Sequence, residues 1–175
     1  ALRSQAFRNF KLPRLSEFFF GAAVGVLVLL LWVYPENLEW YKKYCIIGYR
    51  PDAVSPANVY DPSQCGWGLT AMRLIGSAFI IAPAEELFFR HFLYRWLQKK
   101  DWVSVSHQSF DVSAFVWSVG LFALEHDRIV AAILAGALYT LLYMHKGLWA
   151  AVIAHIVTNF LLGIYVIYTS NWGFW

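Results

Sequence analysis

The stretch Ala82-Pro83-Ala84-Glu85-Glu86-Leu87-Phe88-Phe89-Arg90 decides how the rest of the chain is interpreted. It places two adjacent carboxylates and an arginine inside a long run of mostly apolar residues. The length and apolar character of that run predict a helix embedded in a membrane. Because a charged side chain at membrane depth is costly, these residues are candidates for a functional site.

The composition indicates a membrane protein. Of the 175 residues, 59% are hydrophobic and 14% are charged, whereas soluble domains usually carry about 25% charged residues. Nine Trp and ten Tyr are available for the two membrane interfaces. The net charge of +3 does not indicate nucleic acid binding, and we expect the bases near the N-terminal end to face anionic lipid headgroups. We therefore predict one membrane domain over residues 1–175, with the lipid bilayer as a partner.

The apolar segments predict an all-α, polytopic transmembrane bundle of about five or six helices. A first span runs from Leu15 to Trp32, after a basic interfacial lead-in at 1–14. A second, from Gly66 to about Lys100, is longer than a membrane is thick and contains Pro83, where we expect a kink or an interruption. Three shorter apolar segments follow, at about 111–127, 129–144 and 147–169.

Residues 34–66 are rich in Pro and in charges of alternating sign, which predicts an extramembrane loop with a short helix around Leu38–Tyr44. The loop contains Cys45 and Cys65. They would form a disulfide in an oxidising compartment, and two unrelated thiols are an equally good interpretation. Basic residues gather at the N-terminal end, at 95–100 and at 145–146. The positive-inside rule then predicts a cytoplasmic N-terminus, with the 34–66 loop outside.

Further polar residues lie at membrane depth. Arg90 follows Glu86 by four residues and therefore shares its helix face. His126 ends an apolar segment, and His155 and Asn159 form another pair four residues apart. Counting along each helix from its charged end places Glu85, His126 and the His155–Asn159 pair at similar depths. These groups are therefore able to meet.

Such a cluster has several chemical interpretations. A carboxylate and an imidazole can together remove a proton from water, and a second imidazole with an amide can donate hydrogen bonds to an oxyanion. That set is sufficient to hydrolyse an amide. Glu85, His126 and His155 are also the ligand types of a catalytic zinc, although their spacing is not that of the HExxH motif.

Each residue also has a structural interpretation. Glu86 and Arg90 would form a buried ion pair, which leaves Glu85 without a local partner and makes it the better catalytic candidate. A lone His or Asn in a membrane often bonds one helix to another. Several unrelated polar side chains at membrane depth would each be costly in one small chain. This cost favours the interpretation that they form a common site.

The residues Glu85-Glu86-x-x-x-Arg90, Phe122-x-x-x-His126 and His155-x-x-x-Asn159 resemble, in order and context, the three motifs of the CPBP family. These are the CAAX-protease and bacteriocin-processing membrane proteins, which are related to the eukaryotic Ras-converting CAAX endopeptidase. The resemblance covers a motif-bearing core at about 83–159 and implies an all-helical intramembrane endopeptidase. It is carried by three motifs on successive apolar segments, not by one short pattern.

The resemblance implies a role for each motif residue. It assigns water activation to Glu85 and His126, oxyanion stabilisation to His155 and Asn159, and support to Glu86 and Arg90, with no cofactor. The substrate would be a membrane-associated or lipid-anchored protein or peptide, and the location a bacterial inner membrane. Two alternatives stay open: a zinc-dependent protease on the same residues, and a non-catalytic membrane immunity or scaffold protein.

Overall fold

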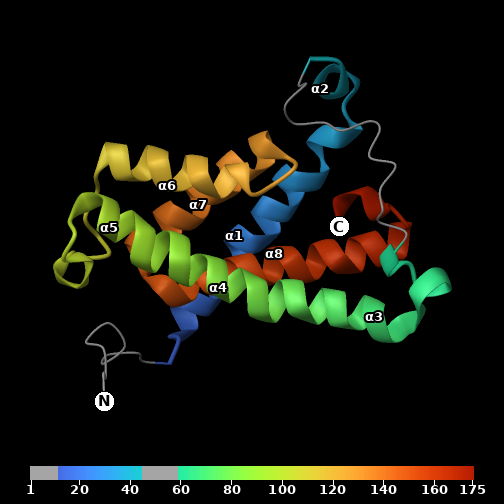
Figure 1. The fold of residues 1–175 in the computed structure, drawn as a ribbon, viewed down its shortest axis with the longest axis horizontal. Coiled ribbons are helices and arrows are strands. Elements are labelled where there is room, and N and C mark those ends of the chain that lie inside the picture. The colour runs from blue at the N-terminus through green and yellow to red at the C-terminus, as the bar shows by residue number, and fades with distance from the viewer. Residues whose placement is uncertain (1–11, 45–58) are drawn as a thin grey trace.

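A computed structural model describes residues 12–44 and 59–175, and this part of the chain is helical without strands (Figure 1). The prediction of an all-α bundle is confirmed. Four helical stretches within it are long and apolar enough to cross a membrane: Leu15–Asn37, Pro62–Gln98, Ile129–Lys146 and Leu148–Thr169. The helix at Val112–Leu124 is apolar but shorter.

Helices α1 (Leu15–Val33) and α8 (Leu148–Thr169) pack closely because two glycines on α1 face alanines on α8. A Cβ on Gly25 would lie 2.5 Å from the carbonyl oxygen of Ala154, and one on Gly21 would lie 2.8 Å from that of Ala150. Small residues four positions apart on both helices allow this approach, as is common between membrane helices.

A long helical rod carries the glutamates. It consists of α3 (Pro62–Gly76), a π-helical turn at Ser77–Ile81, α4 (Ala82–Glu86), a second π-helical segment at Leu87–Leu93 and α5 (Tyr94–Gln98). The rod begins at Pro62, four residues before the predicted start, because Asp61 accepts a hydrogen bond from the Ser63 N–H at 2.8 Å and caps the helix. Gly66, the predicted start, instead bends the first turn through its positive φ of 79°.

The expected irregularity at Pro83 takes the form of a π-helical turn. Pro83 has no N–H to donate to the carbonyl four residues earlier. The helix widens just before it, and the Ala82 N–H bonds to the Ser77 carbonyl, five residues back. The rod therefore continues through the proline, and the disturbance is placed one turn away from Glu85.

The remaining helices complete the bundle (Figure 1). Helix α6 (Val112–Leu124) is capped by Asp111 and runs antiparallel to α7 (Ile129–Lys146). Gly147, with φ of 91°, turns the chain directly into α8. The short helix α2 (Glu39–Tyr44) follows α1, as predicted. The core lies where the long helices meet and includes Val28, Phe89, Phe122, Tyr139 and Ala154.

Candidate active site

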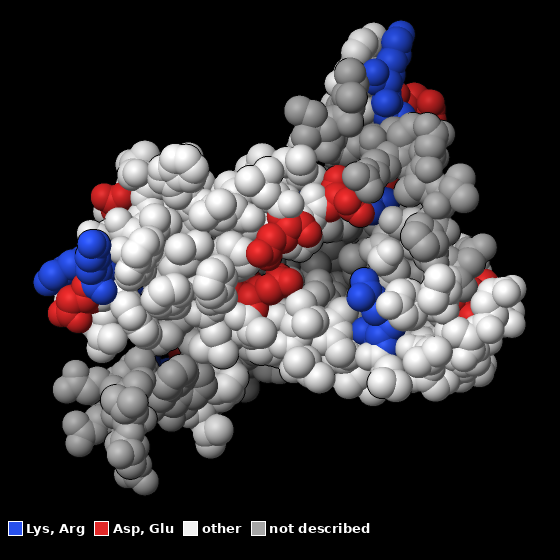
Figure 2. Space-filling model, in the orientation of Figure 1, with Lys and Arg blue, Asp and Glu red and all other residues white. Residues whose placement is uncertain are grey.

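The structure brings the four predicted catalytic residues to one cavity of about 200 Å³. Glu85 comes from α4, His126 from the turn after α6, and His155 and Asn159 from α8. Arg73 of α3 lines the same cavity, as do the side chains of Trp32 and Trp175. In Figure 2 a hollow lies near the middle of the visible face, with Asp or Glu atoms on one margin and Lys or Arg atoms on another.

Glu86 and Arg90 form a buried ion pair. The Arg90 Nη1 atom lies 3.2 Å from Glu86 Oε1, and the two side chains are 0% and 1% exposed. Arg90 Nη2 also donates to the Gly136 carbonyl at 3.3 Å, and the guanidinium lies 4.2 Å from the centre of the Phe122 ring. The arginine therefore joins the rod to α6 and α7, which gives the pair a role in holding the bundle.

Glu85 faces the cavity, in contrast to its neighbour. Successive side chains on a helix point about 100° apart, so burying Glu86 turns Glu85 to a different side. Its side chain is 21% exposed. Among the described residues, Glu85 Oε2 has no hydrogen-bond partner. Oε2 is itself buried and faces His155, so the exposed part of the Glu85 side chain, at the wall of the cavity, is what a water molecule or a substrate can reach.

His155 stands between the two carboxylates. Its Nδ1 lies 2.8 Å from Glu86 Oε1, and its Nε2 lies 3.7 Å from Glu85 Oε2. A carboxylate accepts hydrogen bonds, so Nδ1 carries the hydrogen in the Glu86 contact. The buried ion pair therefore fixes the orientation of the imidazole, and Nε2 is the ring atom directed toward Glu85.

His126 has a tautomer set by its own helix. Its Nδ1 lies 2.8 Å from the carbonyl oxygen of Phe122, one turn earlier. A carbonyl only accepts hydrogen bonds, so Nδ1 is the donor and neutral His126 keeps a lone pair on Nε2. The ring also packs against Phe122 and Trp32, with centroid distances of 4.5 and 5.6 Å. This packing holds the imidazole at the cavity with a nitrogen able to accept a proton.

Asn159 is oriented by the rod that carries Glu85. Its Nδ2 donates to the Ser77 carbonyl at 3.1 Å, in the π-helical turn that precedes Pro83. An amide nitrogen has two hydrogens, and one is used in this bond. The second hydrogen is available to a group in the cavity.

Sequence reasoning did not identify the residues that hold His155 from its other side. The Tyr139 ring stacks on the imidazole at 4.9 Å, and its hydroxyl donates to Thr158 Oγ1 at 2.7 Å. Thr158 in turn donates to backbone carbonyls, including that of Gly25 in α1. The available signal was the presence of two hydroxyl side chains in otherwise apolar helices, one of them next to Asn159.

The alternative zinc site does not fit the observed geometry. In the parts of the chain that the structure describes, no three His, Cys, Asp or Glu side chains are close enough to share a metal ion. Both nitrogens of His155 face carboxylates, and Nδ1 of His126 faces a carbonyl. The described residues therefore present no preformed set of zinc ligands at this cavity.

The other three histidines of the chain, His91, His107 and His145, line a different cavity at one end of the bundle. Cys65 is described, whereas Cys45 lies outside the described residues. The disulfide between them stays a prediction.

Comparison with known proteins agrees with the motif interpretation. No curated protein and no solved structure matches the chain. A family model described as type II CAAX prenyl endopeptidase Rce1-like matches residues 67–161. This segment is more than half of the chain and contains every residue of the three motifs. The chain therefore belongs to the Rce1-like type II CAAX prenyl endopeptidase family.

Proposed function

We propose that this protein is an intramembrane endopeptidase that hydrolyses a peptide bond of a membrane-associated or lipid-anchored substrate. The observation that carries the proposal is the different placement of two adjacent carboxylates. Glu86 is fully buried and paired, whereas Glu85 lies at a cavity with His126, His155 and Asn159. A scaffold protein would be expected to pair every member of such a cluster in a dry contact.

The proposed mechanism begins with water between Glu85 and His126. A cavity of about 200 Å³ has room for several water molecules, at about 30 Å³ each. Glu85 and His126 Nε2 share removal of the proton, and the hydroxide attacks the carbonyl carbon of the scissile bond. The same groups return a proton to the leaving nitrogen as the C–N bond breaks.

His155 and Asn159 stabilise the negative oxygen that forms on the attacked carbonyl. Asn159 supplies its second amide hydrogen and His155 supplies a hydrogen on Nε2. In this role His155 acts as the imidazolium, protonated on both nitrogens before the reaction begins, and its charge lies between the carboxylates of Glu86 at 2.8 Å and Glu85 at 3.7 Å. Removing one such donor from other hydrolases lowers kcat by about 10²–10³, and we expect the same range for Asn159→Ala.

The test compares the wild type with Glu85→Gln in membranes of a host that lacks the protein, using proteomics of new N-terminal and C-terminal peptides. We expect peptide ends that depend on Glu85 and that identify the substrate. Glu125→Gln is the matched control, because Glu125 is exposed and lies near the cavity without lining it. Peptide ends produced equally by Glu85→Gln would refute the catalytic assignment, and ends lost on chelation would favour the zinc alternative.

The location and orientation are part of the same proposal. Arg14, Arg95 and Lys146 line one cavity at a single end of the bundle. We propose a bacterial inner membrane as the location. The positive-inside rule then favours an orientation with this end facing the cytoplasm and residues 34–66 on the other side. Cysteine labelling of Ser104→Cys and Ser63→Cys in intact cells tests this orientation, with Cys45 and Cys65 first replaced by Ser in both variants. The membrane-impermeant reagent should label only the Ser63→Cys variant.

A further inference from the structure

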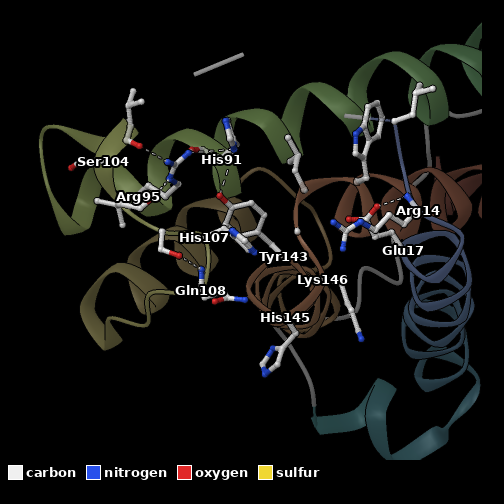
Figure 3. Close-up of a pocket in the computed structure, with 17 residues that line it drawn as sticks. Arg14, Glu17, His91, Arg95, Ser104, His107, Gln108, Tyr143, His145 and Lys146 are labelled. Atoms are coloured by element: carbon white, nitrogen blue, oxygen red, sulfur yellow. Dashed lines mark hydrogen bonds between the residues drawn. The ribbon is translucent and has the colours of Figure 1, made fainter. Parts of the chain in front are cut away.

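A second cavity, of about 740 Å³, lies at the end of the bundle where α1 and α8 begin (Figure 3). Its walls come from the start of α1, the end of the rod, the 103–108 loop and the turn between α7 and α8. None of the four proposed catalytic residues lines it. Its volume lies within the range of small-molecule sites, roughly 300–1,000 Å³.

The charged side chains that line this cavity are mostly positive. Arg14, Arg95 and Lys146 face it, against the single carboxylate of Glu17. Glu17 accepts a hydrogen bond from the Arg14 backbone N–H at 2.5 Å and thereby caps α1. Within the described residues, neither the Arg14 nor the Lys146 side chain is paired with a carboxylate. The cavity thus has an excess of two positive charges.

Hydrogen bonds from Arg95 order the 103–108 loop, which forms one wall of the second cavity. The side chain is 92% buried, and its Nε and Nη2 donate to the Val105 and Val103 carbonyls at 2.9 and 3.0 Å. These carbonyls hold the guanidinium and the loop together, but they do not neutralise the charge. The Tyr94 hydroxyl adds a bond to the Ser109 carbonyl at 2.9 Å. An incoming anion would therefore meet an ordered, positive surface.

The pKa of His107, in the same loop, is affected by the positive charges of the cavity. Burial lowers its pKa, and the nearby positive charge of Arg95 lowers it further. The single carboxylate, Glu17, acts in the opposite direction and does not reverse the shift. This agrees with an excess of positive charge in the cavity.

Apolar side chains beside the basic residues favour a lipid over a free anion as the ligand of this cavity. Leu12 and Leu148 line the cavity beside the bases, and exposed Leu15, Phe18 and Phe19 continue from it along α1. The cavity also lies at the ends of the four candidate membrane spans, which is the level of the headgroups. We propose that it binds the phosphate headgroup of an anionic phospholipid, with Arg14 and Lys146 contacting the phosphate and the acyl chains lying along α1.

The test is native mass spectrometry of the full chain in detergent, titrated with phosphatidylglycerol or with phosphatidylcholine of the same acyl chains. We expect tighter binding of phosphatidylglycerol. A basic residue near a membrane surface contributes about a fivefold change in affinity. Arg14→Gln and Lys146→Gln should each weaken binding by that factor, and the double variant by about 30-fold. Lys100→Gln is the matched control, because Lys100 is an exposed base at the same end that does not line the cavity.

Three outcomes would overturn the proposal. The two lipids could bind equally, or Lys100→Gln could weaken binding as much as Arg14→Gln does, which would show a general charge effect. Millimolar inorganic phosphate could also displace phosphatidylglycerol, which would assign the cavity to free phosphate. Circular dichroism of each variant checks the fold, and the single substitution at exposed Arg14 keeps the test decisive if the double variant unfolds.

Discussion

The ion pair between Glu86 and Arg90 predicts a large effect of a small substitution. Glu86→Gln keeps the size of the side chain and an oxygen that can accept from His155, so it removes little besides the negative charge. It leaves the Arg90 guanidinium 1% exposed, with the bond to the Gly136 carbonyl and the faces of three aromatic rings beside it, none of which carries a compensating charge. Breaking a buried pair from one side costs about 3–5 kcal/mol. Since the amide oxygen still faces Arg90, we expect a loss of about 3 kcal/mol.

The assay is unfolding by sodium dodecyl sulfate in mixed micelles, followed by circular dichroism, from which the free energy of unfolding is obtained. Glu39→Gln is the control, because Glu39 and Lys42 form an ion pair of 3.0 Å on the exposed helix α2. Exposed pairs of this kind contribute less than about 0.5 kcal/mol. A Glu86→Gln protein as stable as the control would refute the claim that burial gives the pair its effect.

Replacing both members of the ion pair distinguishes the cost of an uncompensated buried charge from the cost of the lost contacts. Glu86→Gln together with Arg90→Met removes both charges, so no uncompensated charge stays buried. The double variant should therefore be more stable than Glu86→Gln alone, although it loses the bond from Arg90 to the Gly136 carbonyl. A double variant that shows the full sum of both losses would mean that the two residues act independently.

The same unfolding assay tests three other expectations. Glu85→Gln should change the free energy of unfolding by less than about 0.5 kcal/mol, because its Oε2 makes no hydrogen bond within the described residues and its contact with His155 Nε2 is as long as 3.7 Å; a loss near that of Glu86→Gln would contradict this. Gly25→Ala should destabilise the bundle by about 1–3 kcal/mol through the 2.5 Å approach to Ala154, whereas Gly76→Ala, with open space around it, should not. Arg128→Gln should cost about 1–3 kcal/mol, because Arg128 bonds to both the Glu36 carboxylate and the Gly173 carbonyl; an unchanged stability would show that this link is dispensable.

Much of the fold could be predicted because apolar length is a strong signal. The span predicted from Leu15 to Trp32 ends one residue short of the observed α1, and the turn between the last two helices falls at Gly147. The contact between α1 and α8 could not be predicted in this way. Gly21 and Gly25 matter through what lies opposite them, and that partner is 129 residues away in the case of Gly25 and Ala154.

The composition of the candidate site was also accessible from sequence, but its internal bonds were not. Spacing of four residues predicted that Glu86 and Arg90 share a helix face. It did not predict that His155 would bond to Glu86, nor that Asn159 would donate to the Ser77 carbonyl. Those bonds depend on the position of the rod along the axis of α8. Local sequence does not determine this position.

The π-helical turns on either side of α4 give a physical reason why Glu86 is buried whereas Glu85 faces the cavity. Adjacent residues on a helix point about 100° apart, so one rotation of α4 can bury Glu86 and aim Glu85 into the cavity. Each π-helical turn adds a residue and changes that rotation relative to the regular helix beyond it. The Ser77 carbonyl at the start of the first π-helical turn accepts from both the Ala82 N–H and Asn159 Nδ2, while the turn at Leu87–Leu93 carries Arg90 to its buried partner. The irregular backbone thus sets the rotation of α4 between α8 and the cavity, and Pro83, in the first turn of α4, belongs to the architecture of the site.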